Sequence, residues 1–301
     1  MSQQRRAEIY LLCITIVWGS TFVVTKSILN DSSPLYYSSI RFLLAAFILL
    51  GFTLRSLKSL SWPTLKPGLI LGLLLYVGFI LQTIGLVYTT ASKAAFFTGM
   101  LVPLTPVVQF ISQHLFNAPR RQLRMGNIIG VVCAALGLYL LTSPAGSAFN
   151  LGDGLNLAGA VCFAGFIVYL DSIPREVNKT LLTLVQFAFC GVVGLPIAFL
   201  FEEVSITYTQ DFVLGLLYLT IFATVITMWM QNRFQGDTTP TRAAVIFAME
   251  PVVAAVFAYF VRDEIIGVIG VVGGLIIVTG LLLSEFSDDI PFLKISITRQ
   301  E

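Results

Sequence analysis

The sequence contains few charged residues and a single histidine, His114. Charged residues make up 11% of the 301 residues, whereas soluble domains carry about 25%. Hydrophobic residues make up 56%, and the mean hydropathy is +0.88. This composition excludes an ordinary soluble domain, because so much apolar surface must face something other than water. We therefore predict that the lipid bilayer is the main partner of the chain.

Motifs for nucleotide, metal or nucleophile chemistry are also missing. The sequence has no phosphate-binding GxxxxGK[ST] loop, no HExxH and no GxSxG. The four cysteines lie inside apolar runs, without CxxC or Cys/His spacing, at Cys13, Cys133, Cys162 and Cys190. Basic residues are scattered in short loops, which argues against a nucleic-acid partner. We expect no cofactor, no metal ion and no enzymatic activity.

Ten continuous apolar runs are each close to the length of about 20 residues that a membrane-spanning helix needs. They are Ala7 to Lys26, Tyr36 to Leu54, Pro67 to Tyr88, Ala94 to Phe116, Met125 to Leu141, Gly154 to Asp171, Leu181 to Phe201, Asp211 to Met230, Thr241 to Val261 and Ile265 to Leu283. Within lipid each span must satisfy its own backbone hydrogen bonds, which favours helices over isolated strands. The prediction is an all-α membrane protein with ten transmembrane helices.

Lysine and arginine are retained on the cytoplasmic side of membranes, and their distribution predicts the orientation. With the N-terminus inside, fourteen of the 18 basic residues fall on the inner side and four on the outer side or outer leaflet. The four are Lys26, Arg41, Lys93 and Arg262. We expect both termini to be cytoplasmic, with residues 286–301 as a cytoplasmic tail. Lys26, Lys93 and Arg262 lie at span ends and are interpreted as interfacial anchors.

Short matches recur in the same order in both halves of the chain. A shift of 149 places Gln82–Ala95 on Gln231–Ala244, and a shift of 145 places Arg41-Phe42 on Gln186-Phe187. A shift of 143 places Gly130 and Gly137 on Gly273 and Gly280. Each half, 1–144 and 150–285, holds five expected spans, and an odd number inverts the second copy in the membrane. Two inverted five-helix repeats are typical of secondary transporters with a site at mid-membrane depth.

Several motifs together resemble the EamA branch of the drug/metabolite transporter superfamily. They are Trp18-Gly19-Ser20-Thr21-Phe22 with Lys26, Arg41-Phe42-Leu43-Leu44-Ala45-Ala46, Pro103 or Pro106, Glu250-Pro251, and Asp263-Glu264. The resemblance covers nearly the whole chain. It implies a ten-helix transporter of a bacterial inner membrane that exports amino acids, metabolites or drugs. The family often has a glutamate after span four, where this chain reads Asn117-Ala118-Pro119-Arg120-Arg121.

Glu250 is the strongest single candidate for a functional carboxylate. It lies nine residues after Thr241, hence roughly 13 Å along its helix and well inside the apolar layer. An acid at that depth is costly and faces protein or water rather than lipid. It can bind a proton or a substrate, or make a structural hydrogen bond to a neighbouring helix. Pro251 follows at once and can open the backbone beside it.

The other candidate substrate-binding or coupling residues are Trp18, Gln82, Gln231 and Arg41. Trp18 and the two glutamines either line the pathway or make hydrogen bonds between helices. The two glutamines correspond under the 149-residue shift. Arg41 lies inside span two without an acidic partner in its own helix, so that it either attracts an anionic substrate or extends its side chain to the outer interface. Threonines at helical spacing in spans one and eight, such as Thr21, Thr224 and Thr227, are interpreted as interhelical hydrogen-bonding residues.

These observations predict a secondary transporter of small solutes that works by alternating access and uses a gradient, with protons as the candidate coupling ion. Two other classes stay open. An intramembrane enzyme would need a catalytic constellation, and a passive channel would show conductance without saturation. The sequence does not predict an oligomeric state.

Overall fold

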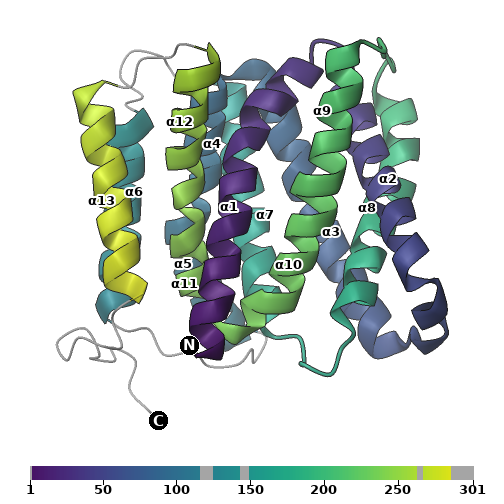
Figure 1. Cartoon of the computed structure of the whole chain (residues 1–301), viewed down its shortest axis with the longest axis horizontal. Coiled ribbons are helices and arrows are strands. Elements are labelled where there is room, and N and C mark those ends of the chain that lie inside the picture. Colours follow the sequence, from purple (N-terminus) through teal and green to yellow (C-terminus); the bar gives the residue numbers. More distant parts are fainter. Residues whose placement is uncertain (1, 116–124, 143–148, 263–266, 286–301) are drawn as a thin grey trace.

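A computed structural model describes residues 2–115, 125–142, 149–262 and 267–285. Over these ranges the named elements are helices, standing roughly side by side (Figure 1). The first repeat expected from the sequence holds α1 (Gln3–Ile28), α2 (Pro34–Thr53), η1 (Leu54–Ser59), α3 (Trp62–Tyr88), α4 (Ala91–Gly99), α5 (Leu101–Leu115) and α6 (Met125–Thr142). The second holds α7 (Leu151–Asp171), α8 (Lys179–Phe201), α9 (Gln210–Thr220), η2 (Ile221–Ile226), α10 (Thr227–Phe234), η3 (Gln235–Asp237), α11 (Pro240–Phe247), α12 (Met249–Arg262) and α13 (Val268–Glu285).

Eight segments of the described chain are long and apolar enough to cross a membrane. Spans five and ten of the sequence prediction are shorter apolar helices, Met125–Leu141 and Val268–Ser284. The chain is therefore a multi-pass, all-helical membrane protein. Observed helices extend beyond several predicted spans, since α1 begins at Gln3 and α3 at Trp62. Phe116, Ile265, the 117–121 segment and the tail at 286–301 lie outside the described residues.

Two predicted spans are interrupted rather than continuous. Span four consists of α4 and α5, which meet at Met100, and span nine consists of α11 and α12, which meet at Ala248. Pro103 and Pro251 each lie three residues after the interruption, in the first turn of the following segment. Proline has no backbone N–H and clashes with the preceding turn, so that a helix restarts before it. Pro106 lies inside α5 without a further break.

The central helices pack around α1 and around α7, and one helix pair lies on each flank (Figure 1). Near the centre, α1 contacts α9 to α12, and α7 contacts α3, α4 and α5. One flank is the pair α2 and α8, and the other is the pair α6 and α13. Hydrophobic clusters join the central helices through residues such as Leu11, Ile167 and Ile246, all almost fully buried. Among the described helices, α1 and α7 therefore lie at the centre.

The flanking pair α6 and α13 is held by glycines at the helix contact. A Cβ atom on Gly137 would lie 2.6 Å from the Gly273 carbonyl oxygen, and one on Gly280 would lie 2.5 Å from Cys133 Cβ. Both distances are too short for real atoms. The glycines at these positions therefore serve packing within one chain.

We expect Gly137→Ala to destabilise the protein. The added methyl group must push α6 and α13 apart, at a cost of about 1–3 kcal/mol. Gly51→Ala is the matched control, because a Cβ at Gly51 in α2 meets nothing within 4 Å, and alanine is the better helix former. Thermal unfolding in detergent should show a lower midpoint for Gly137→Ala only. Equal midpoints for both variants would contradict the close approach.

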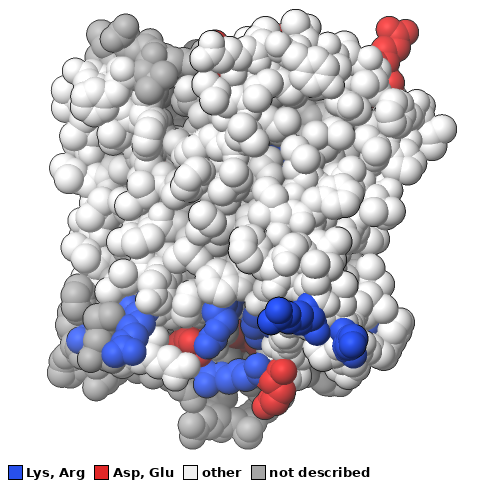
Figure 2. All heavy atoms as spheres, turned by 45° about the vertical axis from the view of Figure 1, so that its right-hand side comes forward, with Lys and Arg blue, Asp and Glu red and all other residues white. Residues whose placement is uncertain are grey.

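Lysine and arginine side chains gather at one end of the helices. Figure 2 shows one face of the molecule, with these side chains along its lower edge and a broad uncharged surface above them. This is the end at which the N-terminus lies in Figure 1. Large apolar side chains on both flanks are exposed, among them Phe47, Phe199 and Tyr139, each between 59% and 62% exposed, as expected for side chains that face lipid.

Candidate functional site

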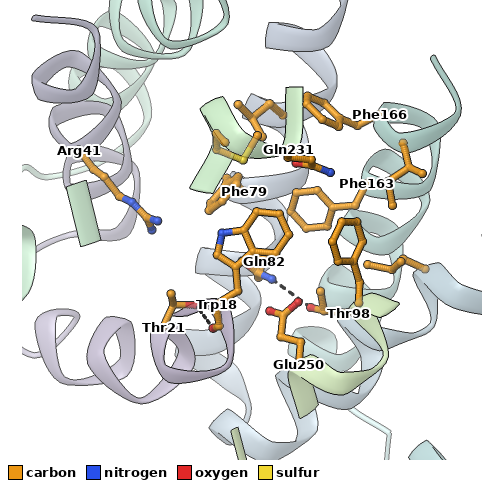
Figure 3. Close-up of a pocket in the computed structure, with 15 residues that line it drawn as sticks. Trp18, Thr21, Arg41, Phe79, Gln82, Thr98, Phe163, Phe166, Gln231 and Glu250 are labelled. Atoms are coloured by element: carbon orange, nitrogen blue, oxygen red, sulfur yellow. Dashed lines mark hydrogen bonds between the residues drawn. The ribbon is translucent and has the colours of Figure 1, made fainter. Parts of the chain in front are cut away.

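A pocket lies between the central helices, and all five candidate residues from the sequence line it (Figure 3). Glu250, Trp18, Gln82, Gln231 and Arg41 come from α12, α1, α3, α10 and α2. Ten further residues complete the lining, namely Thr21, Leu75, Phe79, Thr98, Leu101, Phe163, Phe166, Ile167, Met228 and Phe247. Residues far apart in the sequence thus meet in one place.

Glu250 lies in the first turn of α12, directly after the interruption at Ala248. Its residue is 9% exposed, and its side chain points into the pocket below Trp18 (Figure 3). Among the described residues its carboxylate has no hydrogen bond or ion pair. Gly19 lets α1 approach this turn, because a Cβ there would lie 2.9 Å from the Glu250 carbonyl oxygen and 2.6 Å from Val253. The start of α12 is therefore packed closely against α1, while the Glu250 carboxylate has no polar partner among the described residues.

Trp18 connects α1 to span eight, where η2 joins α9 to α10. Its indole Nε1 donates to Thr227 Oγ1 at 3.0 Å and to the Ala223 carbonyl oxygen at 3.2 Å. The ring also packs against Phe247, with centroids 5.3 Å apart. These contacts fix the indole as one wall of the pocket.

Arg41 is 3% exposed and turns toward the protein interior. Its Nε donates to Thr224 Oγ1 at 2.6 Å and its NH1 to the Tyr37 hydroxyl at 3.2 Å. The guanidinium also lies over the Phe79 ring, 5.2 Å from the centroid. The interpretation that Arg41 extends to the outer interface is therefore wrong, because neighbouring hydroxyl groups and an aromatic face receive the cation inside. Within the described chain it has no carboxylate partner.

A π-helical turn, η2, supplies part of this arrangement. The Ala223 carbonyl oxygen accepts from Trp18 and, at 3.4 Å, from Arg41 NH2. A π-turn shifts the local hydrogen bonding away from the i−4 pattern and is frequent at functional sites. The predicted interhelical role of the span-eight threonines is confirmed for Thr224 and Thr227, which accept from Arg41 and Trp18. Sequence reasoning missed the π-turn itself.

The two glutamines, which correspond under the 149-residue shift, both line the pocket. Gln82 Nε2 donates to Thr98 Oγ1 at 3.1 Å, a bond that Figure 3 shows above Glu250. Gln231 Nε2 donates to Gln235 Oε1 at 2.9 Å along its own helix. Each amide retains polar atoms that can bind a solute.

Aromatic rings were the main group that sequence reasoning missed. Phe79, Phe163, Phe166 and Phe247 line the pocket, and the rings of Phe79 and Phe163 lie edge to face at 5.5 Å. The lining thus combines apolar walls with two amides, one guanidinium and one carboxylate. Among the described residues no group of three or more His, Cys, Asp and Glu side chains lies close enough to hold a metal ion. The arrangement suits an organic solute with polar ends.

The pocket is small in this conformation, with a cavity volume of about 60 Å³. One water molecule needs roughly 10–15 Å³ on such a measure, whereas pockets for organic ligands measure about 300–1,000 Å³. The cavity therefore admits a few water molecules, and a solute would require the surrounding helices to separate.

Comparison with known sequences gives a match to the EamA-like transporter family over residues 5–143 and again over residues 150–286. An uncharacterized transporter of Archaeoglobus fulgidus is 31% identical over 92% of this chain and 85% of its own length. A probable amino-acid metabolite efflux pump of Escherichia coli K12 is 26% identical over 94% of this chain and 95% of its own. An inner membrane transporter of the same strain, YedA, is 26% identical over 81% of this chain and 79% of its own.

The fold also resembles a solved structure. A crystal structure of a protein at 18% sequence identity aligns with a TM-score of 0.75 over 93% of this chain and 96% of the other chain. At that identity the likeness concerns the fold alone, and it extends through both halves of the chain.

Proposed function

Because the chain belongs to the EamA-like transporter family, we propose that it is a secondary transporter that exports amino acids, related metabolites or drugs across the plasma membrane by alternating access. The central pocket is its substrate site. The observation that carries this proposal is the meeting of Glu250, Arg41, Trp18 and both glutamines around one cavity enclosed by helices from both halves.

The inverted-repeat arrangement is supported by the pocket lining. Applying the shifts of 145 and 149, which come from matches elsewhere in the sequence, relates twelve of the fifteen lining residues to one another as six pairs. The pairs are Trp18 and Phe163, Thr21 and Phe166, Phe79 and Met228, Gln82 and Gln231, Thr98 and Phe247, and Leu101 and Glu250. The family match to each half points the same way. A site at the interface between inverted repeats is what alternating access requires.

The charges of the pocket fit a zwitterion. Glu250 offers a carboxylate without a partner among the described residues, and Arg41 offers a guanidinium held by neutral groups. An α-ammonium at Glu250 and an α-carboxylate at Arg41 would neutralise both charges, while the phenylalanine rings receive an apolar side chain. The E. coli relative whose name refers to amino-acid metabolite efflux supports this substrate class.

Protons are the proposed coupling ion, with Glu250 as their binding site. A carboxylate that faces a closed pocket alone is more stable when protonated, and an entering ammonium group favours the charged form. Substrate and proton would therefore compete for Glu250. Such competition links export of a cation or zwitterion to proton entry.

The distribution of basic residues supports a cytoplasmic N-terminus. Figure 2 places the visible lysines and arginines at the N-terminal end, and the YedA relative is named as an inner membrane protein. We expect Ser59→Cys, in η1 at this end, to be protected from an impermeant thiol reagent added to intact cells. Thr207→Cys, in the exposed α8–α9 connection at the other end, should react. The reverse labelling pattern would invert the proposed topology.

The decisive experiment is transport by purified protein in proteoliposomes, with a pooled library of labelled metabolites and with or without a pH gradient. We expect saturable movement of amino acids or related compounds, accelerated by the gradient. Movement that rises without saturation would favour a channel. Absence of transport by correctly folded protein under every gradient would overturn the proposal.

A further inference from the structure

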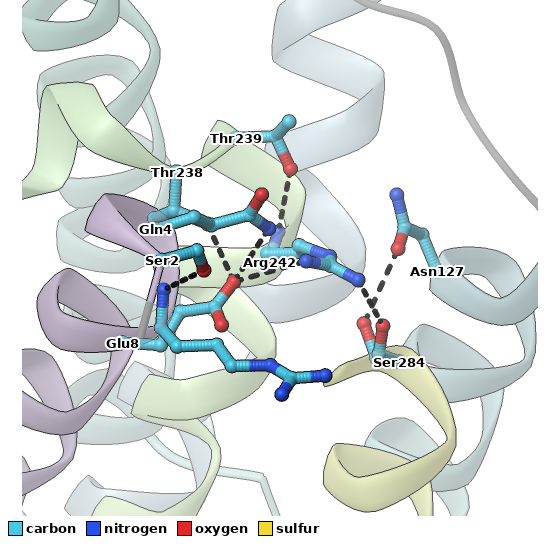
Figure 4. A network of polar contacts seen from close by, with 9 residues as sticks. Ser2, Gln4, Glu8, Asn127, Thr238, Thr239, Arg242 and Ser284 are labelled. Carbon is cyan, nitrogen blue, oxygen red and sulfur yellow. Dashed lines mark hydrogen bonds and ion pairs between the residues drawn. The ribbon is translucent and has the colours of Figure 1, made fainter. Parts of the chain in front are cut away.

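Two buried ion pairs join helices of the two halves at opposite ends of the molecule. Glu8 of α1 pairs with Arg242 of α11, with 3.1 Å between Oε1 and NH1 (Figure 4). Asp153 of α7 pairs with Lys93 of α4, with 2.7 Å between Oδ2 and Nζ. All four side chains are 13% exposed or less. Lys93, which the sequence places at a span end, thus has an acidic partner within the protein.

The two pairs have the same construction. Thr238 donates to Glu8 Oε1 at 3.0 Å, and Thr89 donates to Asp153 Oδ1 at 2.8 Å. Each cation lies in the first turn of a helix whose N-cap threonine accepts from the cation's own backbone N–H. The N-cap threonines are Thr90 for α4 and Thr239 for α11.

The sequence repeat relates every member of one pair to the other. The 149-residue shift carries Thr89, Thr90 and Lys93 onto Thr238, Thr239 and Arg242. The 145-residue shift, taken from spans two and seven, carries Glu8 onto Asp153. Surface ion pairs need no such correspondence, so a shared role for the two buried pairs is the simpler explanation.

Each pair lies about one half-span from the pocket, on the helices that line it. Glu8 precedes Trp18 by ten residues, and Asp153 precedes Phe163 by ten residues, hence roughly 15 Å along each helix. The partner of Glu8 lies on α11, which also carries Phe247. The partner of Asp153 lies on α4, which also carries Thr98. Parting either pair would allow the pocket walls to separate at that end.

We propose that Glu8–Arg242 and Asp153–Lys93 are the two gates of the transport cycle, one at each membrane face. The inference rests on the alternating-access function proposed above. Both gates are closed in this structure, together with a cavity of about 60 Å³. Each ion pair joins the two halves of the chain. Opening one end therefore breaks the pair at that end, while the other pair keeps the opposite end closed. Water that enters the opened end solvates the separated charges, which keeps the opening reversible.

The test measures access to the pocket from each side. The reporter is Thr21→Cys in a background with Cys13, Cys133, Cys162 and Cys190 replaced by alanine. Thr21 lines the pocket, and its hydroxyl donates to the Trp18 carbonyl oxygen of its own helix. Its replacement thus removes no hydrogen bond between helices of the described chain. An impermeant thiol reagent is applied to one face of reconstituted protein at a time.

We expect Glu8→Gln to accelerate labelling from the N-terminal face about tenfold, a change of about 1.4 kcal/mol in the opening equilibrium. Asp153→Asn should accelerate labelling from the opposite face by a similar factor. Glutamine keeps an oxygen for the three bonds that Glu8 Oε1 accepts from Gln4, Thr238 and Arg242. The charge is therefore the main difference.

Arg175→Gln is the matched control. Arg175 pairs with Asp237 at 3.3 Å, but its side chain is 73% exposed, and both residues belong to the second half. Neutralising it should leave labelling unchanged on both faces. Glu8→Asp is a second test with a smaller expected change in the labelling rate. It keeps the negative charge but moves the carboxylate away from Arg242. The exchange Glu8→Lys with Arg242→Glu should restore slow labelling by reforming the pair.

Monodisperse Glu8→Gln and Asp153→Asn proteins that label like the parent, or that both change on the same face, would overturn the gate assignment. This result is distinguishable from failure of the proposed function. If the parent protein transports its substrate while labelling stays unshifted, the gates are wrong and the function stands. If side-specific labelling appears without any transport, the two pairs close the ends of the pocket and the proposed transport function fails.

Discussion

Glu250→Gln is expected to abolish proton-coupled transport while leaving the protein at least as stable as the parent. Glutamine has nearly the same shape as glutamic acid but neither carries the charge nor exchanges the proton. Among the described residues the Glu250 carboxylate makes no hydrogen bond or ion pair, so the substitution breaks no structural contact. Removal of a buried ionisable group without a partner is neutral or stabilising. Gradient-driven uptake should fall about a hundredfold, and the thermal midpoint should stay the same or rise.

The measurement compares uptake by parent and variant across a range of pH in proteoliposomes. Parent uptake should change with pH, because substrate and proton compete for one carboxylate. Glu250→Gln should retain at most slow, pH-independent exchange. Glu203→Gln is a suitable control, since Glu203 is an exposed acid in the α8–α9 connection. A well-folded Glu250→Gln protein with the parent's activity and pH profile would remove Glu250 from the mechanism.

The candidate residues that the sequence predicted share one property, polarity within an apolar run. Glu250, Gln82, Gln231 and Arg41 are costly in lipid, so their presence in spans points to an interior cavity. Phenylalanine carries no such signal. Phe163 lines the pocket, whereas Phe222 is 50% exposed on the outer surface, although both lie in apolar spans. The aromatic walls therefore required the structure.

Local backbone departures were predictable only in part. The interruptions before Pro103 and Pro251 follow from the missing N–H of proline. The π-turn at Ile221–Ile226 contains no proline or glycine, and its Ala223 carbonyl oxygen accepts from Trp18 and Arg41, which lie on other helices. Likewise, nothing in the sequence around Asp153 indicates Lys93 as its partner, because sixty residues separate them. These features depend on tertiary contacts.

The second large effect is expected for Arg41. Arg41→Gln should lower the preference for substrates that carry a carboxylate, because the guanidinium is the positive group that lines the pocket. A hydrogen bond to a charged group contributes about 1.5–3 kcal/mol, which corresponds to roughly tenfold to a hundredfold in specificity. The measured quantity is the ratio of kcat/KM for a transported amino acid to that for its decarboxylated amine. This ratio should fall by that factor.

Two comparisons separate charge recognition from a structural role of Arg41. Arg41→Lys keeps a cation but loses the fork that reaches Thr224 and Tyr37 together, so the ratio should fall only partly. Arg233→Gln, which removes an exposed cation on α10, should leave the ratio unchanged. A structural role predicts a different pattern, in which Arg41→Gln slows transport of the amino acid and of the amine equally. Equal losses would assign Arg41 to support of the π-turn through Thr224 and Ala223, and the carboxylate of the substrate would then need another partner.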